Sequence, residues 1–227
     1  MENSKENWEL AKVCVSASNC AYLNPTLITK NENAFYIGTY KDFKIISFRG
    51  SYTLSNWIDD AEAIRVFRTR FSYVHNGFID AWEDMRDEIK KRISKDDKLI
   101  LCGHSYGAAI SCLAALDCYL DGFNVIKILT QGNPRVGGEG FKKIFNESHL
   151  VLYRFVDGAD LVTDVPLGLG YEHVGEPIYM GYGGKLLTSQ QSPWTWKFWT
   201  ITLKRLLDHK IENYIEMTDL VFKNLFG

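Results

Sequence analysis

The chain has 227 residues, of which 46% are hydrophobic and 14% aromatic, and this is enough apolar material to fill one sizeable core. Its 26 basic and 28 acidic residues give a formal net charge of −2, which argues against the strongly basic surface that nucleic-acid binding requires. No apolar run approaches the roughly 18 residues of a membrane-spanning helix. We therefore expect one domain over residues 1–227, with neither a nucleic-acid partner nor a transmembrane segment.

The N-terminus and the cysteines bear on the cellular compartment. The chain begins MENSKENWEL, which lacks the basic-then-apolar pattern of a secretory signal. The five cysteines are odd in number and scattered, a distribution that favours free thiols in a reducing compartment. These features predict a cytoplasmic location. Neither the cysteines nor the five histidines have the spacing of a metal site, so we expect no metal and no other cofactor.

Segments that are typical of strands alternate with segments that are typical of helices. In chain order they are a β-hairpin of 35–40 and 43–48, a helix over 77–94, a strand over 98–102, a helix over 106–120, and strands over 125–130 and 150–155. This alternation predicts an α/β fold with a mostly parallel central sheet and helices on both faces.

The sharpest local signal is GHSYG at 103–107, between an expected strand and an expected helix. In a nucleophile elbow the chain turns so tightly that side chains two residues either side of the nucleophile would collide with neighbouring backbone. Gly103 and Gly107 meet this requirement around Ser105. The turn would also place the N–H groups of the following helix beside a developing oxyanion. Ser105 is therefore the candidate nucleophile, with a phosphate-binding or structural glycine turn as the alternative.

A serine nucleophile needs a base to accept its proton and a carboxylate to orient that base. In α/β hydrolases the acid follows the serine and the histidine comes last in the chain. This order favours a histidine near the C-terminus and selects His209 over His149 and His173.

The acid should emerge just after a strand, and the residues that follow the expected strand 150–155 offer three aspartates. Asp157 starts the loop and can form a turn with the glycine that follows it. Asp164 lies further round the loop, two residues before a proline. We choose Asp160 and keep Asp164 as the competitor.

Motifs along most of the chain, roughly residues 34–214, resemble those of the class 3 lipases, the fungal lipase-like branch of the α/β hydrolases. They are FRGS at 48–51 with NWIDD soon after, VHNGF at 74–78, GHSYG at 103–107, GNPRVG at 132–137, RFVDGADLV at 154–162, YEHVG at 171–175 and DHKIENY at 208–214. Together they are far more specific than the elbow alone.

The resemblance implies an α/β-hydrolase fold with Ser105 as nucleophile, Asp160 as the orienting carboxylate and His209 as base. It also implies an oxyanion hole formed by Ser51 and by the backbone N–H of Tyr106. The remaining histidines at matching positions are structural in the family, and they are His75, His104 and His173.

In the family a short helix after the FRGS segment is a lid, and residues 53–62 have the pattern for one. Leu54, Trp57 and Ile58 lie on one face of a helix, with polar residues opposite. Such a helix could shield the site when closed and contact a lipid surface when open. An ordinary surface helix is the alternative. A second apolar segment, the tryptophan-rich stretch 192–199, either contacts a bilayer interface or fills the core.

The expected activity is hydrolysis of carboxylic esters with a fatty acyl group, through an acyl-enzyme intermediate. The expected partners are a lipid ester and, transiently, a lipid interface. Two alternatives stay open. One is a phospholipase or acyltransferase with the same triad, and the other is a lipase-like binding module without catalysis.

Overall fold

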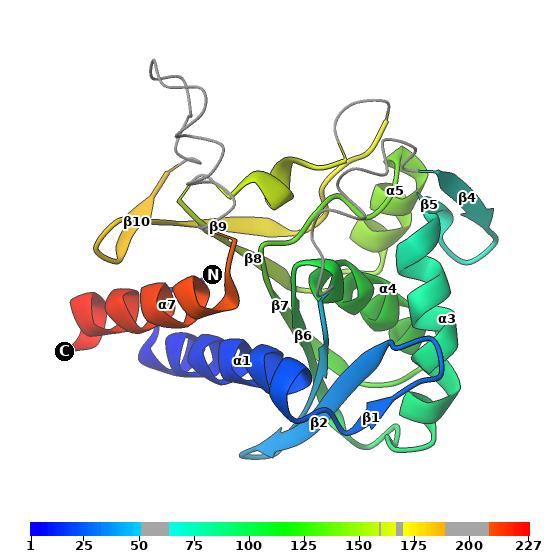
Figure 1. The fold of residues 1–227 in the computed structure, drawn as a ribbon, viewed down its shortest axis with the longest axis horizontal. Helices are drawn as coiled ribbons and strands as arrows, with labels where there is room; N and C mark the ends of the chain where they lie inside the picture. The colour runs from blue at the N-terminus through cyan, green and yellow to red at the C-terminus, as the bar shows by residue number, and fades with distance from the viewer. Residues whose placement is uncertain (51–63, 159, 167–169, 189–208) are drawn as a thin grey trace.

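A mostly parallel sheet forms the centre of the computed structural model, which describes residues 1–50, 64–158, 160–166, 170–188 and 209–227 (Figure 1). In spatial order its eight strands are β1 (Leu27–Ile28), β2 (Ala34–Tyr40), β3 (Phe43–Phe48), β6 (Lys98–His104), β7 (Val125–Gln131), β8 (Leu152–Asp157), β9 (Glu176–Gly181) and β10 (Lys185–Leu187). Strands β3, β6, β7, β8 and β9 run parallel, and antiparallel strands flank them at both edges.

Helices cover both faces of this sheet (Figure 1). Helices α1 (Lys5–Leu23) and α7 (Ile211–Phe226) pack side by side on one face. Helices α3 (Asn76–Lys90), α4 (Tyr106–Leu120) and α5 (Glu139–Glu147) lie on the other. Each face therefore has its own apolar core, and the predicted α/β architecture is confirmed.

Strand β6 shows why the central strands are apolar along their whole length. Its alternate side chains enter different cores, with Leu99 and Leu101 in the α3–α4 core and Ile100 and Cys102 in the α1–α7 core. Successive side chains of a strand point to opposite faces, so a strand covered on both faces must be apolar at every position.

The observed elements agree with the predicted ones in type and differ at their ends. The hairpin 35–40 and 43–48 and the helix 106–120 are observed as β2, β3 and α4. Strand β8 begins and ends two residues later than predicted. Helix α3 ends at Lys90, four residues before the predicted end. The residues that follow form a turn, in which the Ser94 N–H donates to the Asp97 carboxylate over 2.6 Å.

Several elements were not predicted from the sequence. They are helices α1, α5 and α7, the short helix η1 (Leu161–Asp164), strands β1, β9 and β10, and a separate two-stranded ribbon of β4 (Arg65–Arg68) and β5 (Ser72–His75). Helix α1 begins at a sequence signal, because Ser4 Oγ accepts a hydrogen bond from the Asn7 N–H over 3.3 Å. Glu6 lies in the first turn of α1, and α7 has Glu212 in its first turn and Lys223 in its last, the charges that the helix dipole favours.

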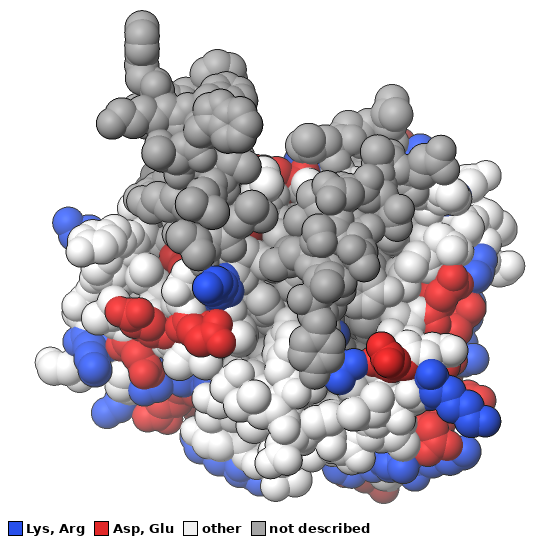
Figure 2. Space-filling view, viewed as in Figure 1, with Lys and Arg blue, Asp and Glu red and all other residues white. Residues whose placement is uncertain are grey.

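Charge is evenly mixed over the face of the molecule in Figure 2, where Lys and Arg side chains alternate with Asp and Glu. Among the described residues of this face, no extended patch of one sign forms. None of the described helices is both long enough and apolar enough to cross a bilayer.

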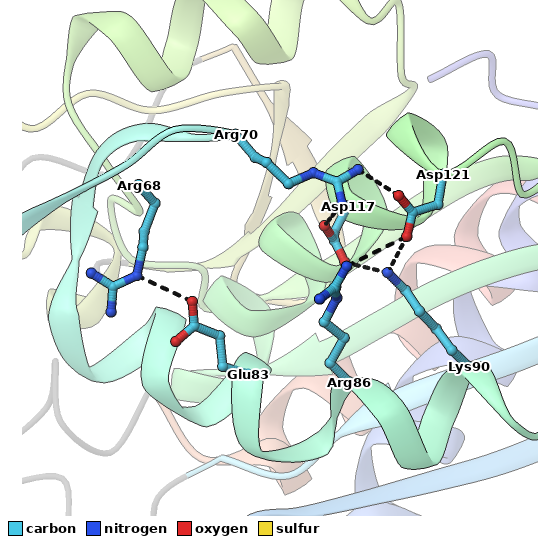
Figure 3. A network of polar contacts seen from close by, with 7 residues as sticks. All are labelled: Arg68, Arg70, Glu83, Arg86, Lys90, Asp117 and Asp121. Atoms are coloured by element: carbon cyan, nitrogen blue, oxygen red, sulfur yellow. Dashed lines mark hydrogen bonds and ion pairs between the residues drawn. The ribbon is translucent and has the colours of Figure 1, made fainter.

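A buried carboxylate joins α4 to α3 and to the turn between β4 and β5 (Figure 3). The Asp117 side chain is 2% exposed and lies 3.1 Å from Arg70 Nη1, 2.7 Å from Arg86 Nε and 2.5 Å from Lys90 Nζ. Asp121, one turn later on the chain, pairs with the same three cations. Hydrogen bonding from Lys90 outweighs burial, and with Arg70 it lowers the pKa of Asp121 to about 2.

We predict that Asp117→Asn lowers the free energy of unfolding by about 3 kcal/mol, because it leaves clustered cations around a buried neutral group. Urea unfolding at pH 7 measures the change. The matched control is Glu83→Gln, whose carboxylate pairs with Arg68 while 49% exposed and should contribute less than about 0.5 kcal/mol. Equal destabilisation by the two variants would contradict the assignment.

Candidate active site

The predicted catalytic segments meet at the carboxyl edge of the parallel sheet. Ser105 follows β6, and Asp160 follows β8 after a short turn. The residues that follow parallel strands all lie at the carboxyl edge of the sheet, which is where α/β folds bind ligands. The Ser105 N–H donates to the Gln131 carbonyl over 2.9 Å, so the end of β7 holds the turn in place.

Ser105 occupies a strained turn. Its φ is 59° and its ψ is −126°, a backbone conformation that costs on the order of 1–3 kcal/mol for a residue with a side chain. A Cβ on Gly103 would overlap the carbonyl of Gly107, and a Cβ on Gly107 would overlap the carbonyl of Phe48. Glycine is therefore required at both positions, for the steric reason argued from the sequence.

Asp160 and His209 form a buried pair. His209 Nδ1 lies 2.8 Å from Asp160 Oδ2, and both side chains are 0% exposed. Asp160 also caps the short helix η1 (Leu161–Asp164), since its Oδ1 accepts from the Val162 N–H over 2.8 Å. Of the three candidate aspartates, Asp160 is thus the one that the structure brings to His209.

The backbones of the other two aspartates are hydrogen-bonded as well. The Asp157 N–H donates to the Tyr214 hydroxyl over 3.2 Å. The Asp164 carbonyl, rather than its carboxylate, accepts a hydrogen bond from Arg135 Nη1 over 2.6 Å.

Burial of Asp160 is offset by its partners. Removal from water acts to raise the pKa of this carboxyl, but the charge on His209 and the hydrogen bonds from His209, Tyr214 and the Val162 N–H hold it below the ordinary value of 3.8. The carboxylate is therefore negatively charged at neutral pH, and it fixes the proton of His209 on Nδ1. Nε2 is left as the basic nitrogen of the ring.

Two polar atoms at the centre of the site have no hydrogen-bond partner within the described ranges. They are Ser105 Oγ and His209 Nε2, and both are buried. An unpaired buried polar atom is costly, so such atoms mark places where chemistry or a bound molecule is expected.

The predicted oxyanion hole is described in part. Tyr106 is the first residue of α4, where the backbone N–H points out of the helix end. Its hydroxyl donates to the Gly77 carbonyl over 2.5 Å, and its ring packs edge-on against Phe78. Ser51, the lid residues Leu54, Trp57 and Ile58, and the tryptophan-rich segment 192–199 lie outside the described residues.

Sequence reasoning missed Tyr214, one residue that the structure adds to the site. The Tyr214 hydroxyl donates to Asp160 Oδ2 over 2.6 Å and is fully buried. It belongs to the DHKIENY segment, but a tyrosine five residues after a histidine carries no known spacing signal. Within the described ranges, no group of three or more histidine, cysteine or acidic side chains is arranged to hold a metal ion.

We predict that Tyr214→Phe lowers the free energy of unfolding at pH 7 by about 2 kcal/mol, because a buried carboxylate loses a donor. The pKa of Asp160 should rise towards 3.8. A carboxyl whose folded-state pKa is depressed stabilises the fold above its unfolded pKa, and this stabilisation is lost as the pH falls through the folded value. Because the interval between the two pKa values narrows in the variant, its acid-induced loss should be smaller, and the stability gap to the wild type should close as the pH falls.

Urea unfolding between pH 7 and pH 3 measures both effects. Tyr153→Phe is the control, because Tyr153 is half-buried on β8 and its hydroxyl has no hydrogen bond to another described residue. If the free energy of unfolding of Tyr214→Phe depends on pH in the same way as that of the wild type, this hydroxyl does not lower the pKa of Asp160.

Known proteins resemble this chain in sequence and in fold. Secreted mono- and diacylglycerol lipase 1 of Fusarium solani is 31% identical over 179 residues, covering 70% of this chain and 50% of that protein. Phospholipase A1-IIgamma of Arabidopsis thaliana is 28% identical over 190 residues, covering 63% of this chain and 45% of that protein. The chain thus spans about half the length of these curated relatives.

The expectation of a cytoplasmic location is wrong, because the Fusarium solani relative is a secreted enzyme. The physical reason lies in what the N-terminal residues do. Ser4 caps α1 and Trp8 is fully buried, so the composition of this segment reflects packing and does not report on export. The cysteines are equally uninformative, since none forms a disulfide and four of the five are buried.

The solved structure of the triacylglyceride lipase of Rhizomucor miehei superposes with a TM-score of 0.69 at 24% identity, over 78% of this chain and 81% of that one. This likeness agrees with the parallel sheet and its covering helices. The sequence pattern of the family described as lipase (class 3) matches residues 45–169, more than half of the chain. The predicted family is therefore confirmed, and the chain belongs to the class 3 lipases.

Proposed function

We propose that the protein is a serine hydrolase that cleaves carboxylic esters of fatty acyl groups, with Ser105 as nucleophile, His209 as base and Asp160 as the residue that orients the base. The observation that carries the proposal is the buried Asp160–His209 contact of 2.8 Å at the edge of the sheet that bears the strained Ser105 turn. The relatives among lipases and a phospholipase A1 support an acyl ester as the substrate class.

The proposed reaction begins with proton transfer from Ser105 Oγ to His209 Nε2, as the oxygen attacks the ester carbonyl. Asp160 stabilises the imidazolium that forms. The negative charge on the tetrahedral intermediate is held by the backbone N–H of Tyr106 and by Ser51. The imidazolium then gives its proton to the leaving alcohol, and water hydrolyses the acyl-enzyme by the same steps in reverse order.

The lid belongs to this proposal as well. A two-faced helix over residues 53–62 would cover the acyl site with Leu54, Trp57 and Ile58 and would turn these side chains to an aggregated substrate. Faster turnover of long-chain esters above their aggregation concentration than below it is the behaviour that such a helix would produce.

A phospholipase is the second candidate, because the match to the Arabidopsis thaliana phospholipase A1 covers 63% of this chain. It would use the same triad on a phospholipid acyl ester. Product analysis with diacylglycerol and phosphatidylcholine in parallel separates the two functions, and added alcohol as acceptor detects acyl transfer.

We predict that Ser105→Ala abolishes ester hydrolysis and labelling by a fluorophosphonate, because both reactions need the same oxygen nucleophile. Initial rates on p-nitrophenyl esters from acetyl to palmitoyl measure the loss. The control is Ser16→Ala, an exposed position on α1. A Ser105→Ala variant with wild-type rates, or a wild-type chain that the probe never labels, would refute catalysis at this site and favour a binding module.

We predict that Ser51→Ala lowers kcat about a hundredfold with little change in KM, because an oxyanion contact that forms in the transition state is worth roughly 3 kcal/mol. Steady-state rates on one soluble short-chain ester give both constants. A rise in KM at constant kcat would instead assign Ser51 to substrate binding.

A further inference from the structure

His104, the residue before the nucleophile, connects two distant segments of the chain. Its Nε2 lies 2.6 Å from the His209 backbone carbonyl. Its Nδ1 lies 3.0 Å from the Tyr22 hydroxyl, near the end of helix α1. Its ring also stacks on the ring of His209, with centroids 4.6 Å apart and planes 29° from parallel. One side chain therefore contacts both the backbone and the ring of the proposed base.

These contacts fix the tautomer of His104. A carbonyl oxygen only accepts hydrogen bonds, so the hydrogen must be on Nε2. Burial, together with the charge on His209, lowers the pKa of His104 to about 3, so the ring is neutral at physiological pH. Nδ1 is then an acceptor, and the Tyr22 hydroxyl must be the donor. The hydrogen bonds run in one direction, from Tyr22 through His104 to the His209 carbonyl.

Tyr22 also lies against the segment that leads to the proposed oxyanion residue. A Cβ on Gly50, which directly precedes Ser51, would overlap the Tyr22 hydroxyl and would lie 2.8 Å from the His104 carbonyl. The Tyr22 hydroxyl therefore lies against both Gly50, just after β3, and the His104 ring. Glycine at position 50 makes room for this hydroxyl.

His209 is held in place by contacts at its ring and at its backbone. Asp160 holds Nδ1, while His104 holds the backbone carbonyl and covers one face of the ring. Rotation of the imidazole about its side-chain bonds would break the contact with Asp160 or the stack. Nε2, the nitrogen that must accept the Ser105 proton, is left as the ring atom without a partner in the described part of the chain.

We propose that Tyr22 and His104 are positioning residues for the base: their hydrogen-bonded bridge holds the His209 imidazole in the orientation that accepts the proton of Ser105. This role rests on the proposed serine hydrolase function. Within the described part of the chain, neither residue hydrogen-bonds to Ser105 Oγ or to His209 Nε2. The bridge acts on the proton-transfer step, in which small displacements of the base cost rate without weakening substrate binding.

The first test is Tyr22→Phe, which removes one hydroxyl and keeps the ring. We expect kcat for a soluble p-nitrophenyl ester and the rate constant of fluorophosphonate labelling each to fall about tenfold, the size expected for one lost hydrogen bond. KM should stay within about twofold. Tyr36→Phe is the matched control, because the Tyr36 hydroxyl on β2 has no hydrogen bond to another described residue. It should react at the wild-type rate.

The second test compares two substitutions of His104. His104→Gln keeps an amide donor for the His209 carbonyl and an acceptor for Tyr22, so it should retain more activity than His104→Ala, which lacks both. In the His104→Ala background, adding Tyr22→Phe should cost nothing more, because the bridge is already broken.

The outcomes separate this inference from the proposed function. A wild-type chain that neither hydrolyses esters nor reacts with the fluorophosphonate would contradict the proposed function, and with it the role of the bridge. If the wild-type chain is active, two results would overturn the bridge alone. One is a Tyr22→Phe variant as active as the wild type. The other is an effect of Tyr22→Phe that is the same in the wild-type and His104→Ala backgrounds. A Tyr22→Phe variant that raises KM while kcat is constant would also overturn it, since the hydroxyl would then act on substrate.

Discussion

The structure around the site depends on one buried charge, the carboxylate of Asp160. A carboxylate without access to water is unfavourable unless hydrogen bonds replace the lost hydration. Here the donors come from three different segments: the backbone N–H of Val162 in η1, the imidazole of His209, and the hydroxyl of Tyr214 in α7. The position of α7 against the sheet is therefore coupled to the ionisation of a single side chain.

This coupling explains why the two terminal helices share one face of the sheet. Helix α7 brings Tyr214 to Asp160, and α1 packs beside α7 and brings Tyr22 to His104. Apolar burial on this face holds both helices, with Trp8 of α1 packed edge-on against Phe155 of β8. The core of the α1–α7 face thus supports the site directly, whereas the α3–α4 face supplies the elbow helix and the network at Asp117.

The parts of the site that could be predicted are those fixed by local sterics or by chain order. Gly103 and Gly107 are required by backbone collisions within one turn, so the elbow is visible in five consecutive residues. The choice of His209, which the structure places against Asp160, follows from the chain order that α/β hydrolases share.

Tyr22 and Tyr214 could not be found in this way, because their partners lie 82 and 54 residues away and no spacing records the contact. The two terminal helices were also missed, because the cap at Ser4 and the end charges of α7 are too weak to locate a helix by themselves. The location was mispredicted because the composition of the N-terminal residues was taken to report on export, whereas these residues belong to a helix that packs against the sheet.

Two groups that contact the Asp160–His209 pair have fixed protonation states. His104 is neutral because burial and the charge of His209 lower its pKa to about 3. Tyr214 keeps its proton because burial and the charge of Asp160 raise its pKa well above the ordinary value. With those two groups fixed and Asp160 ionised, the Asp160 carboxylate is the charged group among the described side chains that hydrogen-bond to or stack on His209. This arrangement supports the proposed role of His209 as base.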